Sequence, residues 1–103
     1  SYAYINVTKT YERIAEKGYK SVDLFEKLGN SYYNNMNMEK AAKWYGELFA
    51  MTSDLDAIYY NQYAKSLCAI GEDEKANLII ENLNKRLKLK REKRYSKKRR
   101  SIK

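Results

Sequence analysis

Apolar side chains recur along the chain at intervals of three, four and seven residues, which is the spacing of one face of an α-helix. No stretch alternates apolar and polar residues with the period of two that a half-buried strand requires. Turn-forming clusters interrupt the pattern at Gly18, Asn34–Asn37, Thr52–Asp54 and Gly71. We therefore predict an all-α fold of five helices, with the expected ranges 3–17, 21–34, 38–51, 55–69 and 72–84.

The connections between these helices are short, so each helix is expected to lie antiparallel to the next. Ser53 or Asp54 is the expected N-cap of the fourth helix, because both side chains can accept a hydrogen bond from its first turn. No breaker follows residue 84, so the fifth helix can extend as far as Tyr95. The predicted organisation is a helical domain over 1–84 and a basic tail over 85–103 that is partly helical or disordered.

The chain repeats its own pattern at a separation of 34 to 35 residues, which is the length of a helix–turn–helix unit. One set of positions reads aromatic, bulky, small, bulky, small, and it occurs as Phe25, Leu28, Gly29, Tyr32 and Ala41 and again as Tyr60, Tyr63, Ala64, Leu67 and Ala76. A second set occurs as Val7, Tyr11 and Ile14 and again as Ala41, Tyr45 and Leu48. We expect the small residues to lie where two helix backbones approach closely and the bulky ones to pack, with Tyr33 and Tyr59 on the surface.

These positions resemble the tetratricopeptide repeat (TPR) family over roughly residues 3–84. The two repeats would be 22–55 and 57–90, preceded by the second helix of a truncated repeat at 3–19. The resemblance implies a short array of antiparallel helix pairs, in which the first helix of each repeat lines a concave groove.

A narrower resemblance rests on three stretches, Tyr11–Tyr19, Leu28–Tyr33 and Glu39–Phe49. They look like the amino-terminal TPR region of multidomain OmpA-like envelope proteins of Gram-negative bacteria. That resemblance implies a periplasmic, outer-membrane-associated module that binds a protein or peptide partner. The chain begins with Ser1 rather than Met, so we expect an excised segment or a processed product.

The groove implied by the repeat would take a peptide or a partner helix on side chains that packing does not need. Reversing the charge of Asp23 and Glu26 is expected to weaken binding of a basic partner. The predicted groove residues are Asp23, Glu26, Asn30, Tyr33, Asn34, Asn61 and Lys65, flanked by Ile58 and Cys68.

Composition argues against an enzyme. The chain has no histidine, so the usual acid–base group at neutral pH and the commonest metal ligand are both missing. Cys68 is the one cysteine, and it has neither a partner for a disulfide nor a strong base to activate it. We expect no catalytic residues, no metal and no cofactor.

The charge is divided unevenly along the chain. Residues 1–84 hold 9 Lys/Arg and 12 Asp/Glu, a net charge of −3, whereas residues 85–103 hold 12 Lys/Arg and a single acid, a net charge of +11. Such a segment attracts nucleic acid or an anionic membrane surface, although a solvated, disordered end with no partner is the other interpretation. As a nucleic-acid- or ribosome-associated adaptor, the protein would be cytoplasmic. The polyanion-binding candidates are Lys85, Arg86, Lys88, Lys90, Arg91, Lys93, Arg94, Lys97, Lys98, Arg99 and Arg100.

Both ends of a short repeat array leave apolar surface that a longer array would cover, which makes self-association a further possibility. The residues expected to be exposed for this reason are Ile5 and Val7 at one end and Leu78, Ile79, Leu87 and Leu89 at the other.

Overall fold

The computed structural model describes the backbone of residues 2–102 and the side chains of residues 7–99. Regular structure in the described backbone is entirely helical, which confirms the predicted all-α class. The five helices are α1 (Tyr2–Glu16), α2 (Val22–Asn34), α3 (Met38–Met51), α4 (Ala57–Ala69) and α5 (Asp73–Ile102).

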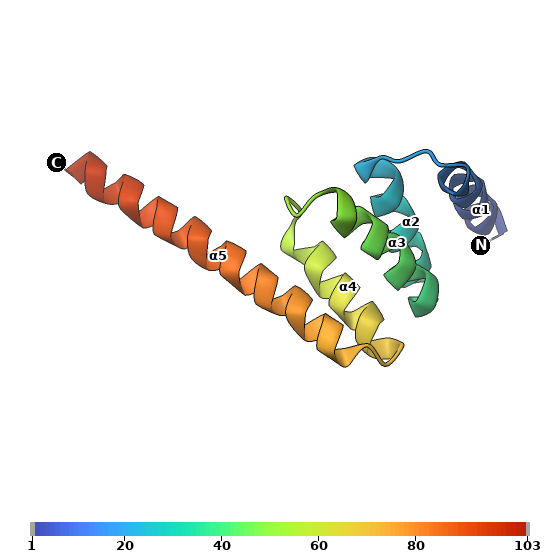
Figure 1. Ribbon diagram of the computed structural model, residues 1–103. Coiled ribbons are helices and arrows are strands. Elements are labelled where there is room, and N and C mark those ends of the chain that lie inside the picture. The colour runs from blue at the N-terminus through green and yellow to red at the C-terminus, as the bar shows by residue number, and fades with distance from the viewer. Residues whose placement is uncertain (1, 103) are drawn as a thin grey trace.

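The helices pack in chain order, each against the next, and α2 with α3 and α4 with α5 form antiparallel pairs (Figure 1). Helix α1 closes one end of this array against α2. The molecule measures 59 × 27 × 25 Å because α5 continues far beyond the other helices. We call residues 7–84 the body and residues 85–99 the extension.

The helix starts follow local hydrogen bonding. Ser21 caps α2 by accepting a hydrogen bond from the Leu24 backbone at 3.0 Å, and Asn37 caps α3 by accepting one from the Lys40 backbone at 3.3 Å. Helix α4 begins two residues later than predicted, after Asp56, whose side chain makes no capping bond.

The prediction that Ser53 or Asp54 caps α4 is wrong, because α4 begins at Ala57 and Asp56 occupies its N-cap position. The Ser53 carbonyl accepts a hydrogen bond from the Tyr60 hydroxyl at 2.5 Å, and the Asp54 carboxylate pairs with Arg86 at 3.1 Å. The segment between α3 and α4 is therefore held by tertiary contacts with α4 and α5.

The core lies between α2, α3 and α4 and is rich in aromatic rings. Trp44 stacks on Phe25 at 5.9 Å between ring centroids, and Phe49 meets the edge of the Tyr60 ring at 4.8 Å. The small residues predicted at close approaches are buried as expected: Gly29, Ala41, Ala64 and Ala76. Fully enclosed positions include Leu28, Ala41, Tyr45 and Leu48, each with no exposed surface.

Helix α1 presents a partly different face from the one predicted. Tyr11 and Ala15 pack against the core as predicted, whereas Ile14, which the repeat aligns with buried Leu48, is 40% exposed. The buried face also carries Thr8 and Glu12. The reason is that α2 and α3 offer hydrogen-bond partners to these polar side chains, as described below.

The expected exposure at the ends of the array is confirmed for Val7, Leu78, Leu87 and Leu89, whereas Ile79 is half-buried against the core. The side chain of Ile5 lies outside the described residues.

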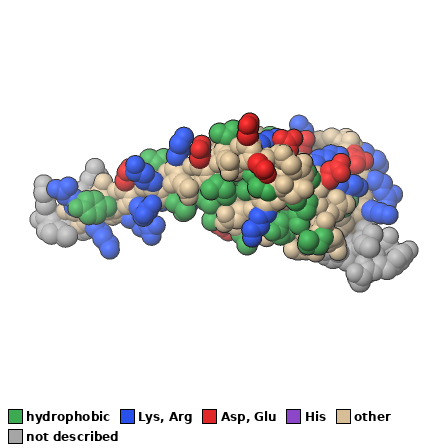
Figure 2. Space-filling view, turned by 90° about the horizontal axis from the view of Figure 1, so that it is seen from below, with side chains coloured by type: hydrophobic (Ala, Val, Ile, Leu, Met, Phe, Trp, Pro, Cys, Tyr) green, Lys and Arg blue, Asp and Glu red, His purple; other side chains and the backbone are tan. Residues whose placement is uncertain are grey.

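Helix α5 is longer than predicted, since it continues past residue 84 and past Tyr95 to Ile102. The segment contains no glycine or proline, and Lys, Arg, Glu and Leu are all good helix formers. At 1.5 Å per residue its 30 residues span about 45 Å. The extension consequently projects from the body with Lys and Arg side chains on both of its sides (Figure 2).

Candidate functional site

The predicted groove residues of α2 share one helical face, because together they span about 100° around the helix axis. Asp23 and Asn34 are exposed, and Glu26, Asn30 and Tyr33 are half-buried. On α4 the exposed members of the predicted set are Ile58, Asn61, Lys65 and Cys68.

Asn30 joins α2 to both α3 and α4. Its side-chain oxygen accepts hydrogen bonds from the Tyr45 hydroxyl at 2.6 Å and from the Gln62 amide at 3.1 Å. Its amide group donates to the Tyr59 hydroxyl at 3.5 Å. Gln62 also donates to the Tyr45 hydroxyl at 2.5 Å. Asn30 is thus a positioning residue that keeps α2 and α4 side by side, and the sequence interpretation missed Gln62.

Tyr33 and Tyr59 were predicted to lie on the surface, but both rings pack partly against the core. Both are half-buried, and each ring centroid lies 6.4 Å from that of Tyr45. A buried tyrosine needs a hydrogen-bond partner for its hydroxyl. For Tyr45 that partner includes Gln62, and this requirement is the one sequence signal that could have pointed to Gln62.

Acidic side chains lie near the amino termini of α2 and α4. Burial raises the pKa of Tyr59, and the nearby carboxylates of Glu26 and Asp56 raise it further, against an opposing effect of the Asn30 hydrogen bond. Asp23 forms an exposed ion pair with Lys27 at 2.9 Å on the same helix. Lys65 carries the opposite charge two turns along α4 from Ile58.

Cys68 is exposed, but its surroundings do not activate it. Partial desolvation raises the pKa of the thiol, and the Asp73 carboxylate raises it further. The group therefore stays protonated at neutral pH, whereas a nucleophilic cysteine needs a lowered pKa. Across residues 7–99, no group of three or more acidic, cysteine or histidine side chains is placed to hold a metal ion.

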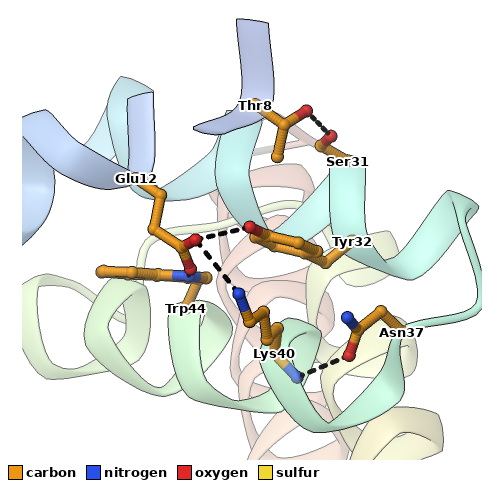
Figure 3. Close-up of polar contacts among 7 residues, drawn as sticks. All are labelled: Thr8, Glu12, Ser31, Tyr32, Asn37, Lys40 and Trp44. Carbon is orange, nitrogen blue, oxygen red and sulfur yellow. Dashed lines mark hydrogen bonds and ion pairs between the residues drawn. The ribbon is translucent and has the colours of Figure 1, made fainter. Parts of the chain in front are cut away.

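A buried carboxylate anchors α1 to α2 and α3 (Figure 3). Glu12 accepts hydrogen bonds from the Tyr32 hydroxyl at 2.7 Å, from the Lys40 ammonium at 3.2 Å and from the Trp44 indole at 3.0 Å. Thr8, one turn earlier, shares a hydrogen bond with Ser31. We call Thr8, Glu12, Ser31, Tyr32, Lys40 and Trp44 the α1 anchor.

Contacts within the α1 anchor shift the pKa values of three of its members, Glu12, Tyr32 and Lys40. Burial raises the pKa of Glu12, but hydrogen bonds from Tyr32, Trp44 and Lys40, together with the Lys40 charge, lower it to a net value below the ordinary 4.5. Burial and then the bond to Glu12 raise the pKa of Tyr32, so the phenol keeps the proton that it donates. The bond to Glu12 also raises the pKa of Lys40.

We expect the stability of the protein to fall in acid partly through Glu12. A carboxyl whose pKa is lowered by folding stabilises the fold fully above its unfolded pKa, and this contribution is lost as the pH falls through the folded pKa. The free energy of urea unfolding, measured between about pH 6 and pH 3, should therefore decrease less steeply in Glu12→Gln than in the parent. Glu16→Gln, which removes an exposed carboxylate from the same helix, should keep the parent slope. Equal slopes for the parent and Glu12→Gln would contradict this assignment.

The residues predicted to bind polyanions lie on the extension. Those from Lys85 to Arg99 are exposed, except that Arg86 is half-buried by its ion pair with Asp54. The side chain of Arg100 lies outside the described residues. The predicted boundary at residue 84 falls inside α5, so the basic segment continues the last helix of the body.

No protein-family model, curated protein or solved structure matches this chain. Among the described helices, none is both long enough and apolar enough to cross a membrane.

Proposed function

We propose that this chain is a non-catalytic protein–protein interaction module of the TPR type, which binds a peptide or a partner helix along the groove between α2 and α4. The observation that supports this proposal most strongly is the pair of hydrogen bonds that Asn30 makes with α4, since it donates to Tyr59 and accepts from Gln62. These bonds fix the relative position of the two helices, so the side chains on their outer face form a preorganised surface. Preorganisation favours binding because little conformational freedom remains to be lost.

The chemistry of the groove suits a polypeptide. Asn34 and Asn61 can donate to and accept from a peptide backbone, and Ile58, which is 58% exposed, offers an apolar contact. Asp23 and Glu26 attract a basic side chain at one end, and Lys65 attracts an acidic one at the other. Opposite charges at the two ends would orient the partner.

The repeat of small and bulky positions supports the TPR assignment within this proposal. Gly29 and Ala41 in one helix pair correspond to Ala64 and Ala76 in the next, and all four are buried at helix contacts. By its resemblance to OmpA-like proteins, the module would belong to a larger periplasmic protein associated with the outer membrane, whereas as a nucleic-acid-associated adaptor it would be cytoplasmic.

Reversing the acidic end of the groove tests this proposal. Immobilised parent chain and the variant Asp23→Lys/Glu26→Lys would be compared for proteins retained from a cell-envelope fraction, with each protein quantified by mass spectrometry. We expect a basic partner to be retained at least about tenfold less by the variant, which corresponds to about 1.4 kcal/mol.

The matched control is Glu39→Lys/Glu47→Lys, which makes the same change of charge at exposed positions of α3. This control should retain the partner as the parent does. If both double variants lose it equally, or if neither does, Asp23 and Glu26 are not part of the binding surface.

A further inference from the structure

One face of α5 is apolar where the helix packs on α4 and becomes basic beyond residue 87. Inward positions over α4 are apolar, at Ala76, Ile80 and Leu83. Leu87 continues this row but is 42% exposed. Steps of three and four residues then bring the row to basic side chains: Arg91, Arg94 and Lys98.

The remaining sides of the extension are basic as well. Arg86, Lys90, Lys93 and Lys97 follow one another at helical spacing along a second side, and Lys88 and Arg99 belong to a third. Residues 85–99 hold 10 Lys/Arg and one Glu, a net charge of +9. Over about 22 Å of helix this is one positive charge per ~2.5 Å, close to the one negative charge per ~1.7 Å of a nucleic-acid duplex.

We propose that the extension of α5 binds double-stranded nucleic acid, with the helix lying in a groove of the duplex and basic side chains on both of its sides contacting phosphates. A helix with its side chains is about 10–12 Å across, and the major groove of B-form DNA is about 12 Å wide. The extension is already helical, and its side chains from Lys88 to Arg99 are exposed. Binding therefore needs neither folding nor displacement of another element.

The distribution of apolar residues argues against two other anionic partners. An amphipathic helix at a membrane surface needs an apolar stripe, but Leu87 and Leu89 lie about 160° apart around the helix. An acidic partner helix in a coiled coil needs apolar residues at two positions of every heptad. Beyond Leu89 the described extension offers only Tyr95, whose ring faces the Arg99 guanidinium at 5.9 Å.

Binding would depend strongly on salt, which makes it measurable without knowing a natural target. We expect the full chain to bind a fluorescent DNA duplex about two helical turns long, with a log–log salt slope of about −5 for roughly six phosphate contacts. Between about 50 and 200 mM salt, anisotropy titrations give this slope directly.

Two charge-matched variants locate the contact. Lys88→Gln/Lys90→Gln/Lys93→Gln removes three charges from the extension, and Lys17→Gln/Lys20→Gln/Lys75→Gln removes three exposed charges from the body. We expect the first variant to bind about 100-fold more weakly or worse at 0.1 M salt, with a slope shallower by about 3, because each lost phosphate contact removes nearly one unit of slope. The body variant should bind within a few-fold of the parent.

Circular dichroism checks that both variants keep the parent helicity, which is expected because Lys and Gln have similar helix propensities. Equal loss in the two variants would overturn the proposal, as would absence of duplex binding by the parent at 0.1 M salt. Tighter binding to vesicles of phosphatidylcholine and phosphatidylserine than to the duplex would also overturn it, in favour of a membrane surface.

Discussion

Replacing Glu12 with alanine is expected to destabilise the protein by about 3 kcal/mol, the largest effect that we predict for a single side chain. The substitution removes the acceptor of three hydrogen bonds, and it leaves the Trp44 indole and the Tyr32 hydroxyl without that partner in a buried setting. An orphaned buried donor costs about 1–3 kcal/mol. Losing the bond from Lys40 adds less to the destabilisation, because about half of the Lys40 side chain is exposed and can be solvated by water.

The measurement is thermal or urea unfolding of Glu12→Ala beside Glu16→Ala. Both variants exchange a glutamate of α1 for the better helix former, but Glu16 is exposed. We expect the Glu12 variant to lose roughly 15 °C in Tm and the Glu16 variant to stay close to the parent. Equal melting temperatures for all three proteins would show that the α1 anchor does not stabilise the fold.

Replacing Gly29 with alanine is expected to destabilise the protein by about 2 kcal/mol. A Cβ at this position would lie 3.1 Å from Cγ of Tyr45 and closer still to Cδ1 and Cε1 of that ring. Tyr45 cannot move away easily, since it has no exposed surface and its hydroxyl is bound to Asn30 and Gln62. Overpacking costs up to about 3 kcal/mol, and the gain in helix propensity offsets about 1 kcal/mol of it.

The chain offers a matched control for this substitution at Gly46, which also lies inside a helix. A Cβ there would meet only the Tyr63 hydroxyl at 3.2 Å and its ring carbon at 3.9 Å. We expect Gly46→Ala to change the free energy of unfolding by less than about 1 kcal/mol in either direction. A Gly29→Ala variant as stable as Gly46→Ala would mean that α2 and α3 do not approach each other as closely as the structure has them.

The repeated positions explain why most of the fold could be predicted from the sequence. Small residues that stand among bulky ones indicate where two helices come into contact. In this chain they are Gly29, Ala41, Ala64 and Ala76. Turn-forming clusters end the first four helices within one residue of the observed bounds. These signals are local, so a single sequence contains them.

The errors arose where a tertiary partner overrides the local pattern. Helix α1 buries Glu12 and leaves Ile14 exposed, because Trp44 and Lys40, far along the chain, supply the hydrogen bonds that a buried carboxylate needs. Hydrophobic periodicity contains no information about such a partner. The cap of α4 was mispredicted for the same reason, since Asp54 pairs with Arg86 of α5.

For the groove predicted on α2 and α4, the structure gives one member, Asn30, another role. Asn30 was expected to bind the partner, whereas its side chain is occupied by Tyr45, Tyr59 and Gln62. An amide side chain at a helical position does not reveal whether its partner is a ligand or a neighbouring helix. The contact surface that we propose therefore depends on Asn34 and Asn61, which are exposed.

Site-specific photocrosslinking tests the groove function most directly. A photoreactive amino acid would be placed at Asn61 in the groove and, as the control, at Glu47 on the exposed side of α3. After illumination with a cell-envelope fraction, we expect one protein partner to be crosslinked from position 61 and not from position 47, and to be lost when Asp23 and Glu26 are both changed to lysine. Crosslinking of the same partner from position 47 alone, or equally from both positions, would contradict binding in the groove between α2 and α4.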